Sequence, residues 1–403
     1  MEAYRNRKLS EIADMITKGT TPTTLGFDFV DDGIHFLKIE CFAENGVFLK
    51  EKVAYISEEC NDKLKRSRLQ EGDILFSIAG AIGRVAIVTK EMLPANTNQA
   101  LAIIRINNPD IYLPYIELVL RSQIVRKQFE KKKQGVAQLN LSLKDIGDLI
   151  IPVPILNKQI EYVNLFNRIS KVIYSQKKQL ELLDELIKSR FVELFGDPVA
   201  NPMHWPVKQL KDLSVQINSG NTPKGGSENY VEAGITFFRS QNVWKDRLEM
   251  DDIAYIDADT HASMKRSSLK HGDILMTKTG RINTENSSLG RAALYMGEDD
   301  MANVNGHVYF IRLKQGVNNK FVLRILVSPE YRDLIRSVCV GGIDKRQLNK
   351  EHIEEFPIIC PPTDMVDSFI AFVEQVNKSK VKVQQSLDET QILMDSLMQK
   401  YFG

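Results

Sequence analysis

The sequence is poor in the side chains that most often build metal sites and disulfides. It has 4 cysteines in 403 residues, and Cys41, Cys60, Cys339 and Cys360 are scattered without a Cys-x-x-Cys pair. The 6 histidines form no His-Glu-x-x-His pattern or other ligand pairing. We therefore expect no metal site, and free thiols in a reducing compartment.

Long apolar runs and a strong net charge are also absent. No apolar stretch approaches the roughly 20 residues that a membrane-spanning helix needs. The polar N-terminus, Met1 to Lys8, has no apolar signal segment, so we expect a cytoplasmic protein without membrane contact. The formal net charge is only +1. Because a protein that binds a polyanion unaided is usually more basic, any nucleic-acid surface must be a local patch or be completed by partner subunits.

Motifs of catalysis are missing too. Gly220 to Ser227 resembles a phosphate-binding loop, but Gly226 stands where such a loop needs lysine. The sequence has no Asn-Pro-Pro-aromatic tetrapeptide, which amino-methyltransferases use to hold the target amine. Pro109-Asp110 lacks the acidic-x-Lys continuation of a nuclease metal site. We therefore expect a non-catalytic chain, with an enzyme of unrecognised site as one alternative.

What the sequence does contain is one long internal repeat, whose matching segments recur in the same order about 200 residues apart. They are Gly19-Thr-Thr-Pro22 with Gly220-Asn-Thr-Pro223, Gly72-Asp-Ile-Leu75 with Gly272-Asp-Ile-Leu275, Asn96-x-Asn98 with Asn303-x-Asn305, and Phe195-Gly196 with Phe402-Gly403. The two copies fill nearly the whole chain, which indicates a pseudo-two-fold tandem repeat. Two similar binding units for a two-part target would explain it, and so would duplication for stability alone.

Each copy divides into a mixed part and a long helix. The mixed part combines Gly-Asp turns with short apolar runs, such as Ile74–Phe76 and Val308–Ile311, which are typical of buried strands. Apolar residues at helical spacing predict one helix from Tyr112 to Gln134. The second copy gains seven residues around Arg281 to Leu289, so we expect a longer loop there. The predicted fold class is α+β, with two similar mixed α/β domains at 1–155 and 203–362 and long helices at 156–202 and 363–403.

Both long helices carry an apolar stripe at alternating three- and four-residue spacing, which is a heptad pattern. The stripe includes Phe166, Ile169, Ile173, Leu180, Leu183 and Ile187 in the first helix and Val376, Val383, Leu387 and Met394 in the second. Since neither helix has another segment of its own length to pack on, we expect the two to form an antiparallel coiled coil. Separate helices packed on their own domains are the alternative. The polar stripe positions Gln176, Arg190, Lys380 and Thr390 suit register setting or a further helical partner.

Polar side chains suited to base edges and phosphates gather at matching positions in the turn-rich segments of both copies. In the first copy they are Lys18, Thr20, Thr21, Lys38, Glu40, Ser77 and Arg84. In the second copy they are Asn218, Asn221, Thr222, Lys224, Arg239, Gln241, Lys278, Thr279, Arg281, Lys345 and Arg346. Arginine can pair bidentately with guanine, and Asn or Gln with adenine. Different side chains at matching positions indicate one scaffold that reads two sequences; solvated turns are the alternative.

A basic stretch from Arg121 to Lys133 is suited to phosphate contacts, and a charged, solvated helix face is the alternative for it.

The order and duplication of these features resemble the specificity (S) subunits of type I restriction–modification enzymes. The marks are the tandem repeat, the two Gly-Asp-Ile-Leu segments, the opening Leu9-Ser-Glu-Ile-Ala13, and Phe191-Val-Glu-Leu-Phe-Gly196 at the end of the first long helix. The resemblance implies two target recognition domains that each read half of a bipartite double-stranded DNA site. It also implies that the coiled coil sets the spacer between the halves.

The resemblance further implies partner subunits that supply the chemistry. Two methylation subunits would dock on this chain and bring S-adenosylmethionine for adenine N6 methylation, and restriction subunits would bring ATP and Mg²⁺. The chain itself would then carry no cofactor and no catalytic residue. The alternative is a scaffold that does not bind DNA, whose paired helices bridge two copies of a partner.

Overall fold

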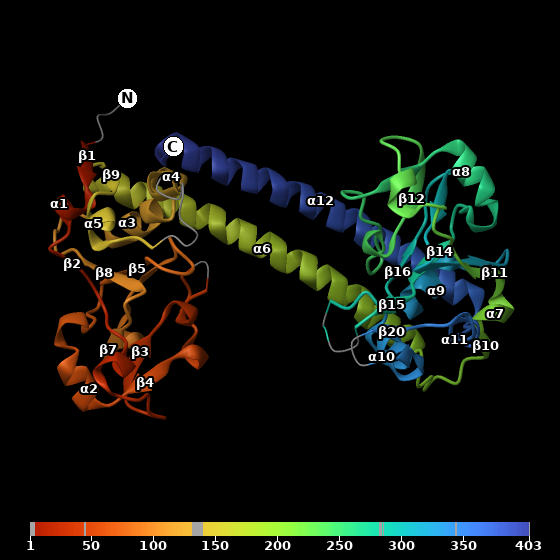
Figure 1. Cartoon of the computed structure of the whole chain (residues 1–403), viewed down its shortest axis with the longest axis horizontal. Coiled ribbons are helices and arrows are strands. Elements are labelled where there is room, and N and C mark those ends of the chain that lie inside the picture. Colours follow the sequence, from red (N-terminus) through yellow and green to blue (C-terminus); the bar gives the residue numbers. More distant parts are fainter. Residues whose placement is uncertain are drawn as a thin grey trace. The chain divides into compact units, whose positions relative to one another are not determined.

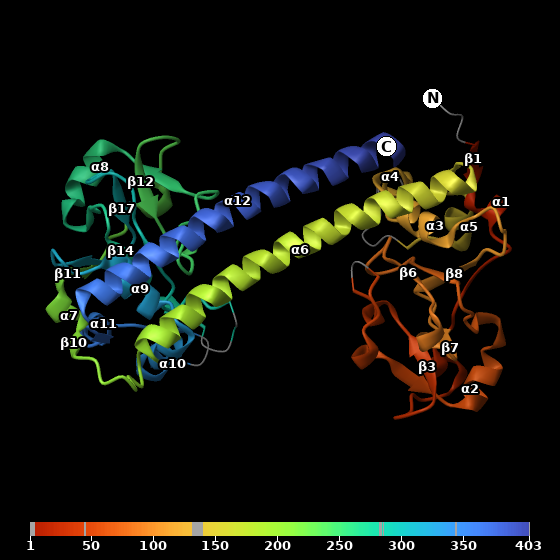
Figure 2. The same cartoon turned by 180° about the vertical axis from the view of Figure 1, so that it is seen from behind.

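The computed structural model describes residues 5–43, 46–130, 140–281, 284, 286–342 and 345–402. They form two compact units (Figures 1 and 2). Unit 1 comprises Met1–Gln179 and Val383–Gly403, and unit 2 comprises Leu180–Lys382. Each unit therefore contains one mixed part together with a portion of both long helices.

Two small sheets form the mixed part of unit 1. The four-stranded antiparallel sheet has the order β2 (Met15–Lys18), β8 (Leu101–Arg105), β5 (Ile74–Ser77) and β6 (Val85–Ile87). The three-stranded sheet has the order β4 (Ala54–Ile56), β3 (Ile34–Leu37) and β7 (Ala95–Thr97), and β3 runs parallel to β7. The remaining elements are the antiparallel pair β1 (Arg5–Lys8) and β9 (Ile150–Val153), and the helices α1 (Leu9–Ile12), α2 (Glu58–Lys63), α3 (Leu113–Leu120), α4 (Gln123–Glu130) and α5 (Leu143–Gly147).

Unit 2 repeats this topology, which confirms the internal repeat. Its four-stranded sheet has the order β11 (Ser214–Ser219), β18 (Val308–Leu313), β14 (Ile274–Thr277) and β16 (Ala292–Leu294), and its three-stranded sheet β13 (Ala254–Ile256), β12 (Ile235–Phe238) and β17 (Ala302–Val304). β10 (Val207–Gln209) pairs with β21 (Pro357–Ile359), and the helices are α7 (Leu210–Leu213), α8 (Ala258–Ser263), α9 (Asn319–Leu326), α10 (Pro329–Val338) and α11 (Lys350–Glu354). A further small sheet joins β15 (Thr279–Gly280), β20 (Arg346–Gln347) and β19 (Val340–Gly341).

A buried ion pair explains why Gly-Asp-Ile-Leu occurs in both copies. The glycine turns the chain with a positive φ, and the next residue places a carboxylate in the core. Asp73 accepts hydrogen bonds from Arg105 Nε and Nη2, both at 2.7 Å. Asp273 accepts from Arg312 Nε at 2.9 Å and Nη2 at 2.7 Å. Because the bidentate arginine satisfies the buried charge, the ion pair links β5 to β8 in unit 1 and β14 to β18 in unit 2.

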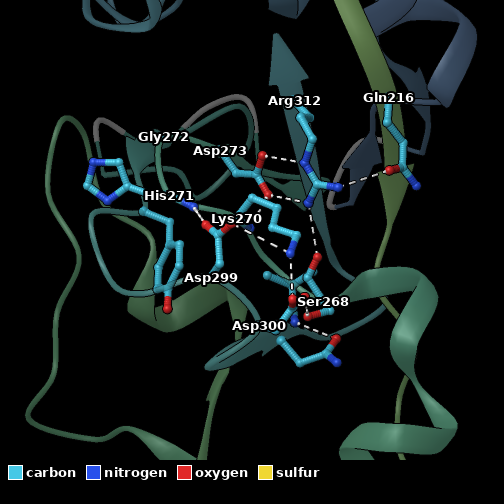
Figure 3. A network of polar contacts seen from close by, with 12 residues as sticks. Gln216, Ser268, Lys270, His271, Gly272, Asp273, Asp299, Asp300 and Arg312 are labelled. Atoms are coloured by element: carbon cyan, nitrogen blue, oxygen red, sulfur yellow. Dashed lines mark hydrogen bonds and ion pairs between the residues drawn. The ribbon is translucent and has the colours of Figure 1, made fainter.

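In unit 2 the ion pair belongs to a larger polar network (Figure 3). Arg312 Nη2 also donates to the Ser268 carbonyl at 3.0 Å, and the Ser268 hydroxyl donates to Asp300 at 2.7 Å. Lys270 Nζ contacts the same Asp300 at 2.5 Å. The hydrogen bonds from Lys270 and Ser268 hold the pKa of the Asp300 carboxyl below its ordinary value. The network stabilises the turn that precedes β14.

The long helices are α6 (Leu156–Phe195) and α12 (Thr363–Phe402), and they pair antiparallel in each unit. In unit 1, Tyr162 lies 4.5 Å from Tyr401 between ring centroids, and farther along α6 the Gln176 amide donates to Thr390 Oγ1 at 3.4 Å. In unit 2, Lys380 Nζ contacts Asp184 at 2.5 Å, and Phe191 lies 5.6 Å from Phe369.

The predicted heptad residues face the partner helix. Buried members are Phe166, Ile169, Ile187, Val376 and Leu387, and half-buried members are Ile173, Leu180, Leu183, Val383 and Met394. The antiparallel coiled coil is thus confirmed, and separately packed helices are excluded.

Two helix predictions needed correction. The helix expected from Tyr112 to Gln134 is broken between α3 and α4, because the buried Ser122 donates its hydroxyl to the Val119 carbonyl at 2.5 Å and ends the first helix. The end of that prediction, residues 131–134, lies outside the described residues. The helix expected over 156–202 ends at Phe195, because Gly196 takes a φ of 73° and turns the chain. No helix in the described ranges is long and apolar enough to cross a membrane.

Candidate nucleic-acid interface

In unit 1, three connections meet just beyond the ends of β2, β3 and β7. Leu37 pairs with Thr97 in the parallel β3–β7 ladder, so the residues that follow both strands leave the sheet at the same edge. A Cβ added to Gly19 would lie 1.8 Å from the Thr97 carbonyl oxygen, so only glycine allows the loop after β2 to approach this closely. Thr21 Oγ1 then hydrogen-bonds Gln99. We call residues 18–21, 38–40 and 98–99 the unit 1 loop cluster.

The unit 1 loop cluster contains five of the predicted DNA contacts. Lys18 and Glu40 are exposed, and Thr20, Thr21 and Lys38 are half-buried. The Lys38 ammonium lies 4.6 Å from the centroid of the Phe29 ring, a cation–π contact that holds it near the surface.

The side chains of Ser77 and Arg84 turn inward, contrary to the expectation for them, and Arg84 Nη1 supports the loop cluster from beneath by donating to the Ile39 carbonyl at 3.4 Å. Ser77 is fully buried, and its hydroxyl donates to the Ala79 carbonyl at 2.9 Å. Arg84 Nη1 donates to the carbonyl of Phe42 at 2.9 Å. Both side chains therefore shape the loop between β5 and β6 from inside.

Unit 2 has the same backbone arrangement around its loops, with other side chains. Phe238 pairs with Val304 in the parallel β12–β17 ladder, and a Cβ on Gly220 would lie 1.8 Å from the Val304 carbonyl oxygen. Asn221 and Thr222 are exposed, while Asn218 accepts a hydrogen bond from Lys350 at 3.4 Å. We call residues 218–222, 239–241 and 305–307 the unit 2 loop cluster. Lys224 is exposed just beyond it.

Two residues of the unit 2 loop cluster share one carboxylate. Arg239 Nη2 lies 3.1 Å from Asp252 Oδ2, and Gln241 Nε2 donates to the same oxygen at 2.9 Å. These hydrogen bonds, from Gln241 first and then Arg239, hold the pKa of Asp252 below its ordinary value. Asp252 thus fixes the arginine and the amide side by side. The matching residue in unit 1 is Lys52, which carries the opposite charge.

The other predicted residues of unit 2 meet in a second place. Strand β15 pairs with β20, with Gly280 opposite Arg346. This pairing joins the segment of Lys278, Thr279 and Arg281 to that of Lys345 and Arg346. We call these five residues the basic ribbon. Arg281 and Lys345 are exposed, and Arg346 Nη1 donates to the Cys339 carbonyl at 3.2 Å. Of these five residues, Arg281 lies in the longer second-copy loop that the insertion predicted, between β14 and β16.

Comparison with known proteins identifies the family that shares this arrangement. Residues 1–185 match the family model described as the type I restriction modification DNA specificity domain. The chain is also 31% identical over 156 residues to the EcoBI specificity subunit of Escherichia coli, a match that spans 38% of this chain and 32% of that relative. The chain is thus similar to the type I restriction–modification specificity subunits, and residues 1–185 match their DNA specificity domain.

Other relatives extend the likeness along the chain. A putative MjaX specificity subunit from Methanocaldococcus jannaschii is 24% identical over 95% of this chain and 92% of its own length. A solved chain from a type I restriction–modification system is 17% identical, with a TM-score of 0.67 over 100% of this chain and 98% of that one. That structure shows a shared fold. The family resemblance that the sequence indicated is confirmed.

Several surface residues were missed by sequence reasoning. Gln99 and Asp252 hold the predicted contacts in place. The sequence did contain a signal for Asp252, because the matching residue of the first copy is Lys52, of opposite charge. The segment Trp244 to Arg247 was missed because nothing in the repeat marks it. In the basic stretch of unit 1, Arg121 turns inward to Glu117 at 2.6 Å, and Arg126 pairs with Glu130 at 3.2 Å. Lys131, Lys132 and Lys133 of that stretch lie outside the described residues.

Proposed function

We propose that this chain acts as a specificity subunit that binds double-stranded DNA at a bipartite site, and that each loop cluster reads one half-site. The proposal rests on the backbone arrangement that the two loop clusters share. Gly19 and Gly220 make the same close approach to a neighbouring carbonyl, while the polar side chains around them differ. A fixed backbone with variable side chains is what one scaffold needs to read two sequences. The major groove presents a distinct pattern for each base pair, so such loops can discriminate all four.

The chemistry of the two clusters predicts different half-sites. In unit 1, Lys18 suits guanine and Glu40 suits the amino group of cytosine. In unit 2, Arg239 suits guanine, and Asn221 and Gln241 suit adenine. Asp252 supports this role because one carboxylate oxygen contacts both Arg239 and Gln241 and so orients them before DNA arrives. The basic ribbon adds cations for phosphates nearby.

Exposed apolar residues on the paired helices support docking of two methylation subunits. Tyr174 and Leu393 in unit 1 are 72% and 50% exposed. Their repeat-related positions in unit 2 are Val381 and Leu186, which are 57% and 46% exposed. Exposed apolar side chains on a helix pair can contribute to an interaction surface. Because the positions recur in both copies, we infer two equivalent docking sites, one on each unit.

The partners would supply the reaction. Methylation subunits would bring S-adenosylmethionine, flip the target adenine out of the stack and methylate its N6. Restriction subunits would bring ATP and Mg²⁺. This chain would hold no cofactor and would select the site. A complex that acts on DNA in this way would work in the cytoplasm. Each helix of 40 residues is about 60 Å long, which makes the pair suited to fix the spacer between half-sites.

The test is selection from a random duplex pool with the complex of this chain and its methylation subunit. We expect an enriched motif with two defined halves and a fixed gap. Replacing residues 1–155 with the corresponding part of a related subunit should change one half only. A single contiguous motif would contradict two readers, and no enrichment by an intact complex would favour a scaffold without DNA recognition.

A further inference from the structure

Unit 2 contains a strongly basic surface cavity that none of the predicted contacts lines. Its volume is about 580 Å³, and Trp244 forms part of its wall. Its charged lining consists of Lys245, Arg247, Arg291, Arg332, Arg336 and Asp333. These residues come from three separate places: the segment 244–247, the residues around β16, and α10. Five cations and one carboxylate give the cavity a clear excess of positive charge.

Nearby carboxylates neutralise part of this charge. Asp333 pairs with Arg336 at 3.1 Å, and Glu249, outside the cavity, pairs with Arg247 at 2.5 Å. Lys245 has no ion-pair partner anywhere in the described ranges. Partial desolvation lowers the pKa of Lys245, and the positive charges of Arg332, Arg291 and Arg336 lower it further. Positive side chains held this close together repel one another, and a bound anion would relieve that repulsion.

The cavity is built from fixed side chains. The Arg291 guanidinium lies 3.8 Å from the centroid of the Trp244 ring and is 9% exposed in the folded chain. Its Nε donates to the Ser287 carbonyl at 3.0 Å, and its Nη2 to the Asn286 carbonyl at 2.5 Å. A guanidinium held this way is oriented before any ligand binds, so little entropy is lost on binding.

Its position ties the cavity to DNA recognition. Trp244 Nε1 donates to the carbonyl of Gln241, in the unit 2 loop cluster, at 3.0 Å. On the other side, Ser288 follows the lining residue Ser287 and donates to the carbonyl of Thr279, in the basic ribbon, at 2.8 Å. The cavity therefore adjoins both the unit 2 loop cluster and the basic ribbon. A DNA phosphate that flanks the read bases fits this place better than an acidic segment of a partner protein.

Unit 1 keeps only part of this lining: Arg84 stands at the position of Arg291, but other cations of the cavity have no counterpart. The bridges Phe42–Phe48 and Val243–Leu248 show that residues 43–47 correspond to 244–247. The first segment reads Ala-Glu-Asn-Gly-Val and the second Trp-Lys-Asp-Arg, so all the cations of this segment are in unit 2. On the following helix, Glu130 stands where unit 2 has Arg336, and it neutralises Arg126.

From this geometry we propose that the cavity binds a backbone phosphate of the half-site read by unit 2, and that unit 1 has no equivalent site among its described residues. The inference rests on the proposed DNA-binding function and adds an anchor that is independent of base sequence. Arginine forks match phosphate oxygens bidentately, and Lys245 adds a point charge. Binding to this half of the site should consequently depend more on salt than binding to the other half.

The test compares the variant K245Q/R247Q with the control K265Q/R266Q, both in the complex with methylation subunits. Both variants remove one lysine and one arginine charge at exposed positions, and the control pair lines neither the cavity nor a loop cluster. Dissociation constants are measured over a range of salt with the selected duplex. We expect K245Q/R247Q to weaken binding about tenfold, to lower the salt slope by about 1, and to leave the selected motif unchanged. The control should match the wild type.

Neutral methylphosphonate linkages locate the contact. One such linkage in the unit 2 half-site should weaken the wild type about as much as K245Q/R247Q does, and should not weaken that variant further. An unchanged affinity and salt slope in K245Q/R247Q would overturn the proposal. So would an altered motif, which would indicate base reading, or loss of the methylation subunit on gel filtration, which would indicate an acidic protein partner. The wild-type selection tests the proposed function separately.

Discussion

The C-terminal end of α12 is expected to be essential for the stability of unit 1. Phe402 is 2% exposed, and its ring centroid lies 5.6 Å from Phe166, 5.9 Å from Tyr115 and 6.4 Å from Tyr162. The second repeat thus completes the core of the unit that holds the first mixed part. In unit 2, Phe195 at the end of α6 does the same, at 5.0 Å from Phe321.

Phe402→Ala removes a buried aromatic ring and leaves a cavity. Such a change costs about 3–5 kcal/mol, a large share of the roughly 5–15 kcal/mol that stabilises a domain. For a unit of about 200 residues, each kcal/mol lowers the melting temperature by about 2–4 °C. We therefore expect the melting temperature of unit 1 to fall by roughly 6–20 °C.

Hydrogen exchange read by mass spectrometry can assign the loss to a unit. Phe402→Ala should reduce protection in α3 and β9 of unit 1 before unit 2 is affected, and Phe195→Ala should do the reverse. Ile392→Ala is the control, because Ile392 is 68% exposed and the change should cost less than about 0.5 kcal/mol. Equal loss of protection in both units, or none in α3, would refute the role assigned to Phe402.

Four further predictions concern the helix pair, the core and the site. Gln176→Leu should raise the free energy of unfolding by about 1 kcal/mol in urea titrations, because Gln176 Oε1 is buried without a hydrogen-bond partner; a decrease would show that its bond to Ser386 at 2.8 Å matters more. Asp273→Asn should destabilise unit 2 by about 3 kcal/mol or more in thermal unfolding, since it leaves the Arg312 charge without its buried partner; a near-neutral effect would contradict its role in linking β14 to β18. Arg239→Ala should change only the half-site read by unit 2 in duplex selection, whereas equal loss over all sequences would make Arg239 a phosphate contact. Lengthening α6 and α12 by one heptad each should lengthen the spacer in the selected motif without altering either half, and an unchanged spacer would refute the idea that the helices set it.

Features with a local period could be read from the sequence. The heptad stripe depends only on spacing along one helix, and its members, from Phe166 to Met394, face the partner as predicted. The repeat was equally plain, because matching glycines and aspartates occupy the same turns. The break at Ser122 was missed, since a hydroxyl that bonds a carbonyl three residues back competes with a helix without disturbing its apolar pattern.

The site was only partly predictable because its contacts join distant segments. Lys18 and Lys38 were predicted as contacts because they lie in turn-rich segments. Their loops come together because β3 pairs in parallel with β7. Arg84 was expected at the surface, yet its partner is a carbonyl 42 residues away, which no local pattern reveals. The cavity beside Trp244 was missed for the same reason, as its cations come from three parts of the chain.

The two mixed parts are expected to read their half-sites independently of each other. The most direct measurement replaces residues 203–362 with a second copy of residues 1–155 and repeats the duplex selection in the presence of the methylation subunit. The account predicts a bipartite motif whose two halves have the same sequence. A motif that keeps the original second half, or contains only one half although the complex is intact, would contradict it.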